Sequence, residues 1–183
     1  MKGGPAVLAD SRKEGLMKVE GSRSHGGEEL TALHMMEAGD NSALLCIGDE
    51  ALSERIARIL HELDYQVMSA REPSAARSML EFDPCSLIVL EERFGAAEAS
   101  KNPVLLYLQG LTMVVRRRLF LCLLTDEAPT LDLMAAFCAG VNVIINVQEV
   151  EKMPVILDRV MRDHRAFYAL FSEELGKKDT SPA

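Results

Sequence analysis

The sequence predicts an α/β protein in which five β-strands alternate with helices to form a doubly wound parallel sheet. Two patterns support this prediction. Short unbroken apolar runs, typical of strands buried on both faces, recur from residue 43 onward. Longer segments between them carry apolar residues at helical spacing, and turn or capping residues separate the two kinds of segment. Such alternation implies right-handed crossovers and a layer of helices on each face of the sheet.

The elements follow one another in a regular order. The five predicted strands are the apolar runs at residues 43–47, 65–70, 86–90, 119–125 and 141–147. The five predicted helices come after them, over residues 51–64, 73–82, 103–118, 131–139 and from Pro154 to about Leu175. Proline at a first-turn position is typical of a helix start, and we expect Pro73 to play this part.

Capping residues set the expected helix ends. Asn102 and Thr130 are predicted N-caps, because their side-chain oxygens can accept hydrogen bonds from the first backbone N–H groups. Gly140 lies where a glycine commonly ends a helix. The basic run Arg116 to Arg118 is interpreted as a solvated helix end.

Composition limits the function. The formal net charge is −8 and the isoelectric point is near 5.1, which argues against nucleic acid or an anionic membrane as a partner. No apolar stretch approaches the roughly 20 residues that cross a bilayer, and the first residues lack the apolar core of a signal peptide. We therefore expect a cytoplasmic protein.

Sulfur-containing residues favour a packed, reduced interior. The four cysteines lack C-x-x-C spacing and are predicted to be buried reduced thiols: Cys46, Cys85, Cys122 and Cys138. Five methionines are interpreted as core filler: Met79, Met113, Met134, Met153 and Met161. Motifs for dinucleotide, phosphate-loop and zinc-protease sites are absent from the sequence, and so is a nucleophile elbow. We expect no enzymatic activity, no cofactor and no metal.

Composition divides the chain into three regions. Residues 1–41 are rich in Gly, Ser, Lys and Glu and are predicted to be a disordered tail, with a short helical stretch around "EELTALHMMEA" at residues 28–38. Residues 42–176 form the predicted domain, and residues 177–183 a second disordered tail.

Several local sequences together resemble the receiver domain of bacterial response regulators. The resemblance covers residues 43–171 and rests on "ALLCIGDE", "ILHELDYQVMSA", "FDPCSLIVLE", "CLLTDE" and "CAGVNVIINV". It implies the flavodoxin-like, CheY-like strand order 2-1-3-4-5. In that family two acids after the first strand hold Mg²⁺, and an aspartate after the third accepts a phosphoryl group. A hydroxyl after the fourth strand and a lysine after the fifth bind the phosphoryl oxygens.

The resemblance maps these roles onto residues of a different kind. The acidic pair falls on Gly48 and Asp49 or on Ile47 and Gly48, depending on the alignment, with Glu50 next. Glu91 takes the phosphoacceptor position and Thr125 keeps the hydroxyl. The positions of the switch aromatic residue and the lysine become Ile144 and Val147. The interpretation is a degenerate, or pseudo-, receiver, since the charges that stabilise phosphoryl transfer are largely missing.

Two interpretations of Glu91 remain open. Its carboxylate, one methylene longer than that of aspartate, could lie near Thr125 and imitate the phosphorylated state. Alternatively, it is a solvated acid at a strand end. The replacement Glu91→Gln distinguishes the two, because only the first predicts a loss of partner binding.

The last helix offers a candidate interface. It carries two apolar stripes, one with Ile156, Val160, Phe167 and Phe171, and one with Leu157, Met161, His164 and Tyr168. Aromatic residues beyond the expected core are enriched at interfaces, so Phe167, Tyr168 and Phe171 are candidates, together with Arg159 and Arg162. The alternative is that they fold back over the sheet edge or on the tail. His164 and Asp163 point to different helix faces, and His61 has no partner pattern, so neither histidine suggests catalysis.

The expected function is therefore a phosphorylation-independent protein–protein interaction module in bacterial signal transduction or localisation, with an unidentified protein partner or a homodimer through the last helix. The fourth and fifth helices with the fifth strand are the expected contact surface. Two alternatives remain: an atypical receiver that is still phosphorylated, and a flavodoxin-like domain that binds a small ligand or nucleotide.

Overall fold

The computed structural model describes residues 41–83 and 85–179. Residues 1–40 of the predicted N-terminal tail, with the helical stretch at 28–38, fall outside these residues, as do residues 180–183. No helix in the described ranges is both long and apolar enough to cross a membrane.

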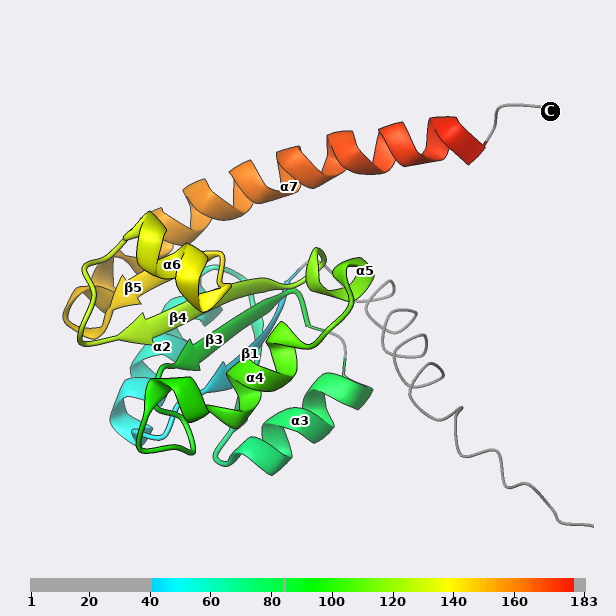
Figure 1. The fold of residues 1–183 in the computed structure, drawn as a ribbon. Helices are drawn as coiled ribbons and strands as arrows, with labels where there is room; N and C mark the ends of the chain where they lie inside the picture. The colour runs from blue at the N-terminus through cyan, green and yellow to red at the C-terminus, as the bar shows by residue number, and fades with distance from the viewer. Residues whose placement is uncertain (1–40, 84, 180–183) are drawn as a thin grey trace, which may run out of the picture.

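Five parallel strands form one sheet in the order β2-β1-β3-β4-β5 (Figure 1). The strands are β1 (Ser42–Cys46), β2 (Gln66–Ala70), β3 (Leu87–Glu91), β4 (Phe120–Thr125) and β5 (Val143–Asn146). This order confirms the fold class predicted from the alternating sequence pattern. Parallel pairing places the carboxyl ends of all five strands at the same edge of the sheet.

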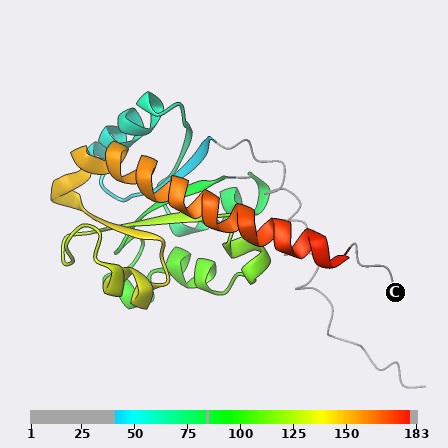
Figure 2. The same cartoon turned by 90° about the horizontal axis from the view of Figure 1, so that it is seen from above.

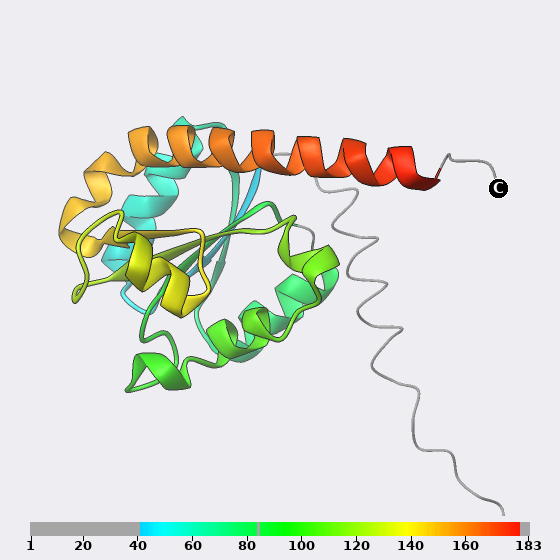
Figure 3. The same cartoon turned by 45° about the horizontal axis from the view of Figure 1, so that its top comes forward.

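Helices cover both faces of the sheet, as Figures 2 and 3 show from two directions. On one face pack α3 (Pro73–Phe82), α4 (Pro103–Gln109), α5 (Met113–Arg116) and α6 (Leu133–Ala139). On the other face pack α2 (Glu50–Glu62) and α7 (Met153–Asp179). Leu44 and Leu45 are both fully buried and face opposite layers, because successive side chains of a strand alternate. Burying one such leucine contributes about 1.5–3 kcal/mol.

Two predicted helix ends are confirmed and one is wrong. Asn102 caps α4 by accepting hydrogen bonds from Val104 N and Leu105 N, and Gly140 ends α6 in the left-handed conformation. The N-cap of α6 is Asp132, whose Oδ1 accepts from Ala135 N at 2.9 Å, and not Thr130. The Thr130 hydroxyl instead accepts a hydrogen bond from Asn146 N, so it ties the loop before α6 to β5.

The predicted helix over residues 103–118 is broken into α4 and α5. The chain leaves α4 at Gly110, and the short α5 then ends at Arg116. Arg116 is half-buried, so its interpretation as a solvated residue is wrong. Its guanidinium donates to Leu119 O at 3.0 Å, to Gly140 O at 2.8 Å and to Asn142 Oδ1 at 3.2 Å. Burial lowers the pKa of this guanidinium. Its hydrogen bonds hold the end of α5 against the turn after α6.

Part of the sulfur-residue prediction is also wrong. Three cysteines are buried, whereas Cys138 is exposed on α6. Burial raises the pKa of the Cys46, Cys85 and Cys122 thiols to about 12, so these thiols stay protonated. Met153 and Met161 are buried, but Met113 and Met134 lie on the outer faces of α5 and α6. A periodic apolar pattern cannot show which face of a short helix meets the sheet.

The last part of the chain starts with a 3₁₀ segment, η2 (Val147–Lys152), which leads directly into α7. The last helix therefore begins at Met153, one residue before the predicted Pro154, and is described through Asp179. Figure 1 shows α7 running across the sheet layer and projecting beyond it.

Candidate functional site

The carboxyl edge of the sheet brings the predicted site residues together. Strand register aligns Cys46 with Leu90, Glu91 with Leu124, and Thr125 with Asn146. The loops that follow β1, β3, β4 and β5 therefore begin at one level. In open α/β sheets this edge is where ligands bind.

Glu91, the last residue of β3, points toward the loop after β1. Its Oε2 accepts a hydrogen bond of 2.7 Å from the backbone N–H of Gly48. A Cβ atom added at Gly48 would lie 3.4 Å from that same oxygen. The Glu91 side chain therefore lies against position 48, where a larger side chain would meet it.

Asp49 and Glu50 have other partners. Asp49 Oδ1 accepts from Leu52 N at 2.7 Å, so it is the N-cap of α2. Glu50 pairs with Arg71 at 2.5 Å, on the chain that follows β2. Both carboxylates are thus engaged in local structure, which is the ordinary use of an acid in the first turn of a helix.

The Thr125 hydroxyl is paired with Glu92, the residue after the strand. It donates to Glu92 Oε2 and accepts from Glu127 N at 3.1 Å, and Thr125 is buried. Of the two adjacent glutamates, Glu92 is therefore the one bonded to the Thr125 hydroxyl, whereas Glu91 is bonded to Gly48 N. Glu91 is the last residue of β3 and Glu92 lies in the turn that follows, so the two side chains reach different partners. The sequence signal was present in the pair of adjacent glutamates, but it did not say which one faces Thr125.

A group of acids next to Thr125 was not predicted. Carboxylate oxygens of Glu92, Asp126 and Glu127 lie within 4.8 Å of one another. Carboxylate oxygens are the ligands that Mg²⁺ and Ca²⁺ prefer. Two of these acids already have partners, since Glu92 accepts from Thr125 and Glu127 pairs with Arg93. The main effect of the group is a negative potential at this edge of the sheet.

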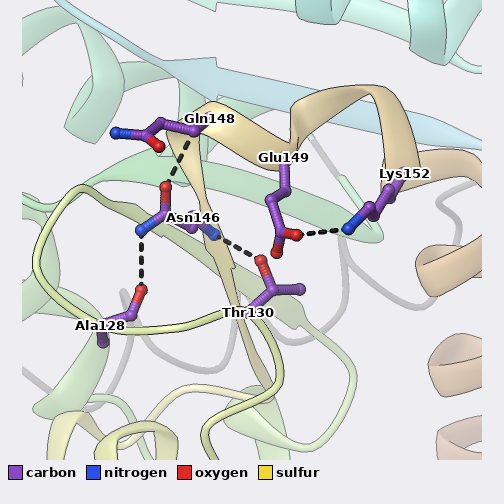
Figure 4. Close-up of polar contacts among 6 residues, drawn as sticks. All are labelled: Ala128, Thr130, Asn146, Gln148, Glu149 and Lys152. Carbon is purple, nitrogen blue, oxygen red and sulfur yellow. Dashed lines mark hydrogen bonds and ion pairs between the residues drawn. The ribbon is translucent and has the colours of Figure 1, made fainter.

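Residues at the end of β5 hold the neighbouring loop in place (Figure 4). The Asn146 side chain donates to Ala128 O and accepts from Gln148 N, both at 3.0 Å. The Asn146 backbone N–H donates to the Thr130 hydroxyl at 3.0 Å. Ile144 is buried in the core, and Val147 packs partly buried against the layer of α2 and α7. Sequence reasoning missed Asn146, although asparagine directly after an apolar run is typical of a turn cap.

The loop between β4 and α6 carries further restraints. Leu131 has a positive φ of 65° and donates from its backbone N to Ile144 O at 2.9 Å. Glu149 pairs with Lys152, and this bond, followed by one from Thr130, lowers the pKa of the Glu149 carboxyl. The loop is therefore bonded to β5 and η2 at several points.

The interface candidates on α7 differ in exposure. Phe167 is 65% exposed and stacks edge-to-face on Tyr168, with ring centroids 5.1 Å apart. Arg159 is exposed, and Arg162 is exposed and paired with Asp158. The side chain of Phe171 lies outside the described part of the chain. The stripe containing Leu157 and Met161 is the one that covers the sheet.

His164 links α7 to the sheet through aromatic contacts. Its ring lies 5.3 Å from that of Phe120 and 4.7 Å from that of Tyr168. Within the described residues, its Nε2 is buried without a hydrogen-bond partner. Burial, followed by the positive charges of Arg116 and Arg165, lowers the pKa of this imidazole. His61, by contrast, is exposed and its Nδ1 lies 3.2 Å from Tyr65 O, so it does have a partner.

This environment predicts a pH-dependent stability. Because the folded state disfavours protonated His164, the unfolded chain binds more protons below the ordinary histidine pKa of about 6.5. The contribution of His164 to stability is complete above this pKa and decreases as the pH falls below it. We expect urea midpoints to fall from pH 7.5 to pH 5.5, and to fall less in His164→Phe. His61→Gln is the control, and equal pH dependence in His164→Phe and the unmodified protein would contradict the assignment.

Comparisons with known proteins agree with the fold. No family model and no curated protein matches the sequence. Among solved structures, the chain is similar to a yeast Spc42 coiled-coil fusion, with 17% identity, a TM-score of 0.55, and 76% of this chain and 85% of that chain covered. It is similar to a candidate response regulator from Chloroflexus aurantiacus, with 14% identity, a TM-score of 0.52, and coverage of 67% and 99%. It is also similar to an adenylate cyclase from Rhodopirellula baltica, with 19% identity, a TM-score of 0.52, and coverage of 77% and 99%.

These identities are low, so the similarities concern the fold alone. The chain has a five-stranded parallel sheet in the order 2-1-3-4-5 and a receiver-like, CheY-like α/β fold, similar to that of the Chloroflexus protein.

Proposed function

We propose that this chain is a pseudo-receiver that binds a protein partner without being phosphorylated, as a module in bacterial signal transduction. It acts by binding and catalyses no reaction of its own. The observation that carries this proposal is the pairing at the carboxyl edge of the sheet. Glu91 is bonded to Gly48 N, and the Thr125 hydroxyl is bonded to Glu92.

This pairing opposes phosphoryl transfer in two ways. An incoming phosphoryl group would meet the negative charges of Glu91, Glu92 and the neighbouring acids at close range, where like charges repel. The hydroxyl that would bind its oxygens already donates to a carboxylate, and the lysine position holds Val147. Phosphoryl transfer depends on cations and donors arranged around the developing charge.

The bonded loop before α6 supports independence from phosphorylation. Three hydrogen bonds fix this loop to β5: Asn146 Nδ2 donates to Ala128 O, Asn146 N donates to the Thr130 hydroxyl, and Leu131 N donates to Ile144 O. A switch needs two arrangements that differ by only a few kcal/mol. Several simultaneous bonds favour one arrangement, so the surface built on α6 and β5 is presented continuously.

The outer face of α6 is the best candidate for the partner surface. The helix has the sequence LMAAFCA, without a polar residue, and Leu133 and Phe137 are each 81% exposed. Met134 and Cys138 are exposed on the same helix. Exposed apolar residues grouped on one short helix are typical of a protein–protein contact. Arg159 and Phe167 on α7 would extend this surface along the last helix.

Phosphorylation is tested by incubation with a small acyl phosphate and Mg²⁺, followed by intact-mass measurement. We expect no phosphoryl adduct, because the edge lacks the aspartate and the lysine of the receiver family. The double variant Glu91→Asp with Val147→Lys tests the converse, because it restores the aspartate and the lysine of the receiver family. A stoichiometric adduct on the unmodified chain would show an atypical active receiver instead.

Partner binding is tested by affinity capture with the tagged full chain. We expect a protein captured by the unmodified chain to be lost, by at least about tenfold, with Leu133→Glu and Phe137→Glu, because each buries a charge in an apolar contact. Glu91→Gln keeps an acceptor for Gly48 N and is expected to bind normally. The double variant Phe167→Ser with Phe171→Ser tests whether α7 contributes to partner binding. Light scattering measures the mass in solution and so shows whether the partner is a second copy of this chain. Equal capture by all variants would contradict the proposed surface.

A second candidate function, binding of a small ligand, is favoured by a separate hollow. This hollow lies beside the ends of β1 and β2 and the start of α2, has a volume of about 380 Å³, and is lined by Ser53, Glu54 and Arg71, among others. Small-ligand sites usually span about 300–1,000 Å³. A nucleotide that raises the melting temperature of the unmodified protein, but not of Arg71→Ala, would favour this function.

A further inference from the structure

A groove runs between α7, the end of α2 and the start of β1. It has a volume of about 380 Å³. Its floor is apolar and is formed by Leu63, Tyr65, Leu157 and Met161. Three of these residues are buried, and Tyr65 Oη donates to Met161 Sδ at 3.1 Å, so the floor is firmly packed. A preformed apolar floor of this size suits two or three apolar side chains of a docking segment.

The rim of the groove is charged. Arg162 and Arg165 are exposed along the α7 side, with Asp158 paired to Arg162. Asn41, the first described residue, lies at the groove as well. A segment that immediately precedes Asn41 in the sequence therefore needs only a short link to reach the groove.

The residues immediately before Asn41 have the complementary chemistry. Residues 28–40, EELTALHMMEAGD, contain four acids and no Lys or Arg. Leu30, Leu33 and Met36 recur every three residues, a spacing that places them along one side of a helix. The acids precede and follow this stripe, opposite in charge to the two arginines of the rim. Methionine adapts well to irregular apolar surfaces.

We propose that residues 28–40 of this chain dock as an amphipathic helix in the groove of α7, α2 and β1, with Leu30, Leu33 and Met36 on the floor and the acids facing Arg162 and Arg165. Three residues, 38–40, lie between Glu37 and Asn41, so the Cα of Glu37 must lie within about 14 Å of the Cα of Asn41. Such a short link gives an effective concentration in the millimolar range, which favours this segment over a segment from another molecule.

A docked segment would also cover part of the last helix. Arg162 is one of the interface candidates on α7, and it would be shared between the segment and any partner that binds there. The segment then limits partner contact on α7 while leaving the exposed face of α6 open. This consequence concerns α7 alone, so the docking stands or falls independently of the partner surface on α6.

Hydrogen–deuterium exchange of the full chain, read by mass spectrometry, tests the proposal. We expect the amides of residues 28–40 to exchange at least about tenfold more slowly than an unstructured chain, because a docked helix protects its N–H groups. The double variant Arg162→Glu and Arg165→Glu is expected to lose this protection. Arg159→Glu, a charge change on the same helix outside the groove, is the matched control and is expected to keep it.

Variants in the segment separate docking from damage to the domain. Leu33→Ser with Met36→Ser lies outside the sheet and its helices, and is expected to abolish protection of residues 28–40 while the amides of β1 and β3 remain protected. Unprotected residues 28–40 in the unmodified chain would overturn the proposal. So would protection that survives the double arginine variant, or protection that grows with protein concentration, which would make a second copy the occupant.

Discussion

We expect Asn102→Ala to destabilise the domain by about 1.5–5 kcal/mol, because one buried side chain makes four hydrogen bonds. Asn102 is completely buried, and its Oδ1 accepts from Val104 N at 3.0 Å and Leu105 N at 3.1 Å. Its Nδ2 donates to Glu91 O and Glu92 O, both at 3.0 Å. Loss of a helix cap costs about 0.5–2 kcal/mol, and buried groups left without a partner cost about 1–3 kcal/mol more.

The measurement is urea unfolding at equilibrium, with two comparisons. Asp132→Ala removes a cap with one bond, to Ala135 N, and is expected to cost about 1 kcal/mol. Asn102→Asp keeps a good capping oxygen but loses the two donor bonds, so it is expected to recover only part of the loss. An Asn102→Asp protein as stable as the unmodified chain would show that the bonds to Glu91 O and Glu92 O contribute nothing.

Gly95→Ala is expected to cost about 2–5 kcal/mol, for two separate reasons. Gly95 has a φ of +70°, which an L-residue adopts at a cost of about 1–2 kcal/mol. A Cβ atom there would lie 2.2 Å from Pro73 Cγ and 2.9 Å from Pro73 Cδ. Since a proline ring cannot rotate away, the loop after β3 and the start of α3 must separate, at about 1–3 kcal/mol.

A double-mutant cycle with Pro73→Ala divides these two costs. The contact term is removed when both substitutions are present, whereas the backbone term remains, so the coupling energy measures the contact. Gly110→Ala is the control, because its φ is negative and the nearest atom to an added Cβ lies at 3.5 Å. It is expected to change stability by less than about 0.5 kcal/mol. A loss below about 1 kcal/mol in Gly95→Ala would contradict the predicted clash.

Both predictions concern the loop between β3 and α4, which carries Glu92 away from the strand. Asn102 holds the carbonyls of Glu91 and Glu92, and Gly95 packs the loop on α3. The positions of the two glutamates at the carboxyl edge therefore depend on residues that make no contact with Thr125. Loosening this loop is expected to disturb the Glu92–Thr125 pair as well as the stability.

The sequence by itself determined the order and type of the elements. Apolar runs and helical spacing indicate which segments are strands and which are helices. These patterns extend over only a few neighbouring residues, so the bounds of the five strands and the main helices were predicted within a few residues. The cap at Asn102 and the glycine at 140 were predicted for the same reason. A capping residue acts on backbone groups a few positions away, so it can be predicted from the neighbouring sequence.

Only the tertiary structure decided which residues far apart in sequence meet. Thr125 pairs with Glu92, 33 positions away, because β3 and β4 lie side by side and end at the same edge of the sheet. Arg116, predicted to be solvated, is half-buried and bonds to Gly140 O and Asn142 Oδ1 in the turn after α6. The outward face of α6 and the groove beneath Arg162 were likewise fixed by how helices pack on the sheet. Hydrophobic periodicity shows which apolar residues share one side of a helix or strand. Only the packing of the elements decides whether that side is buried or exposed to solvent.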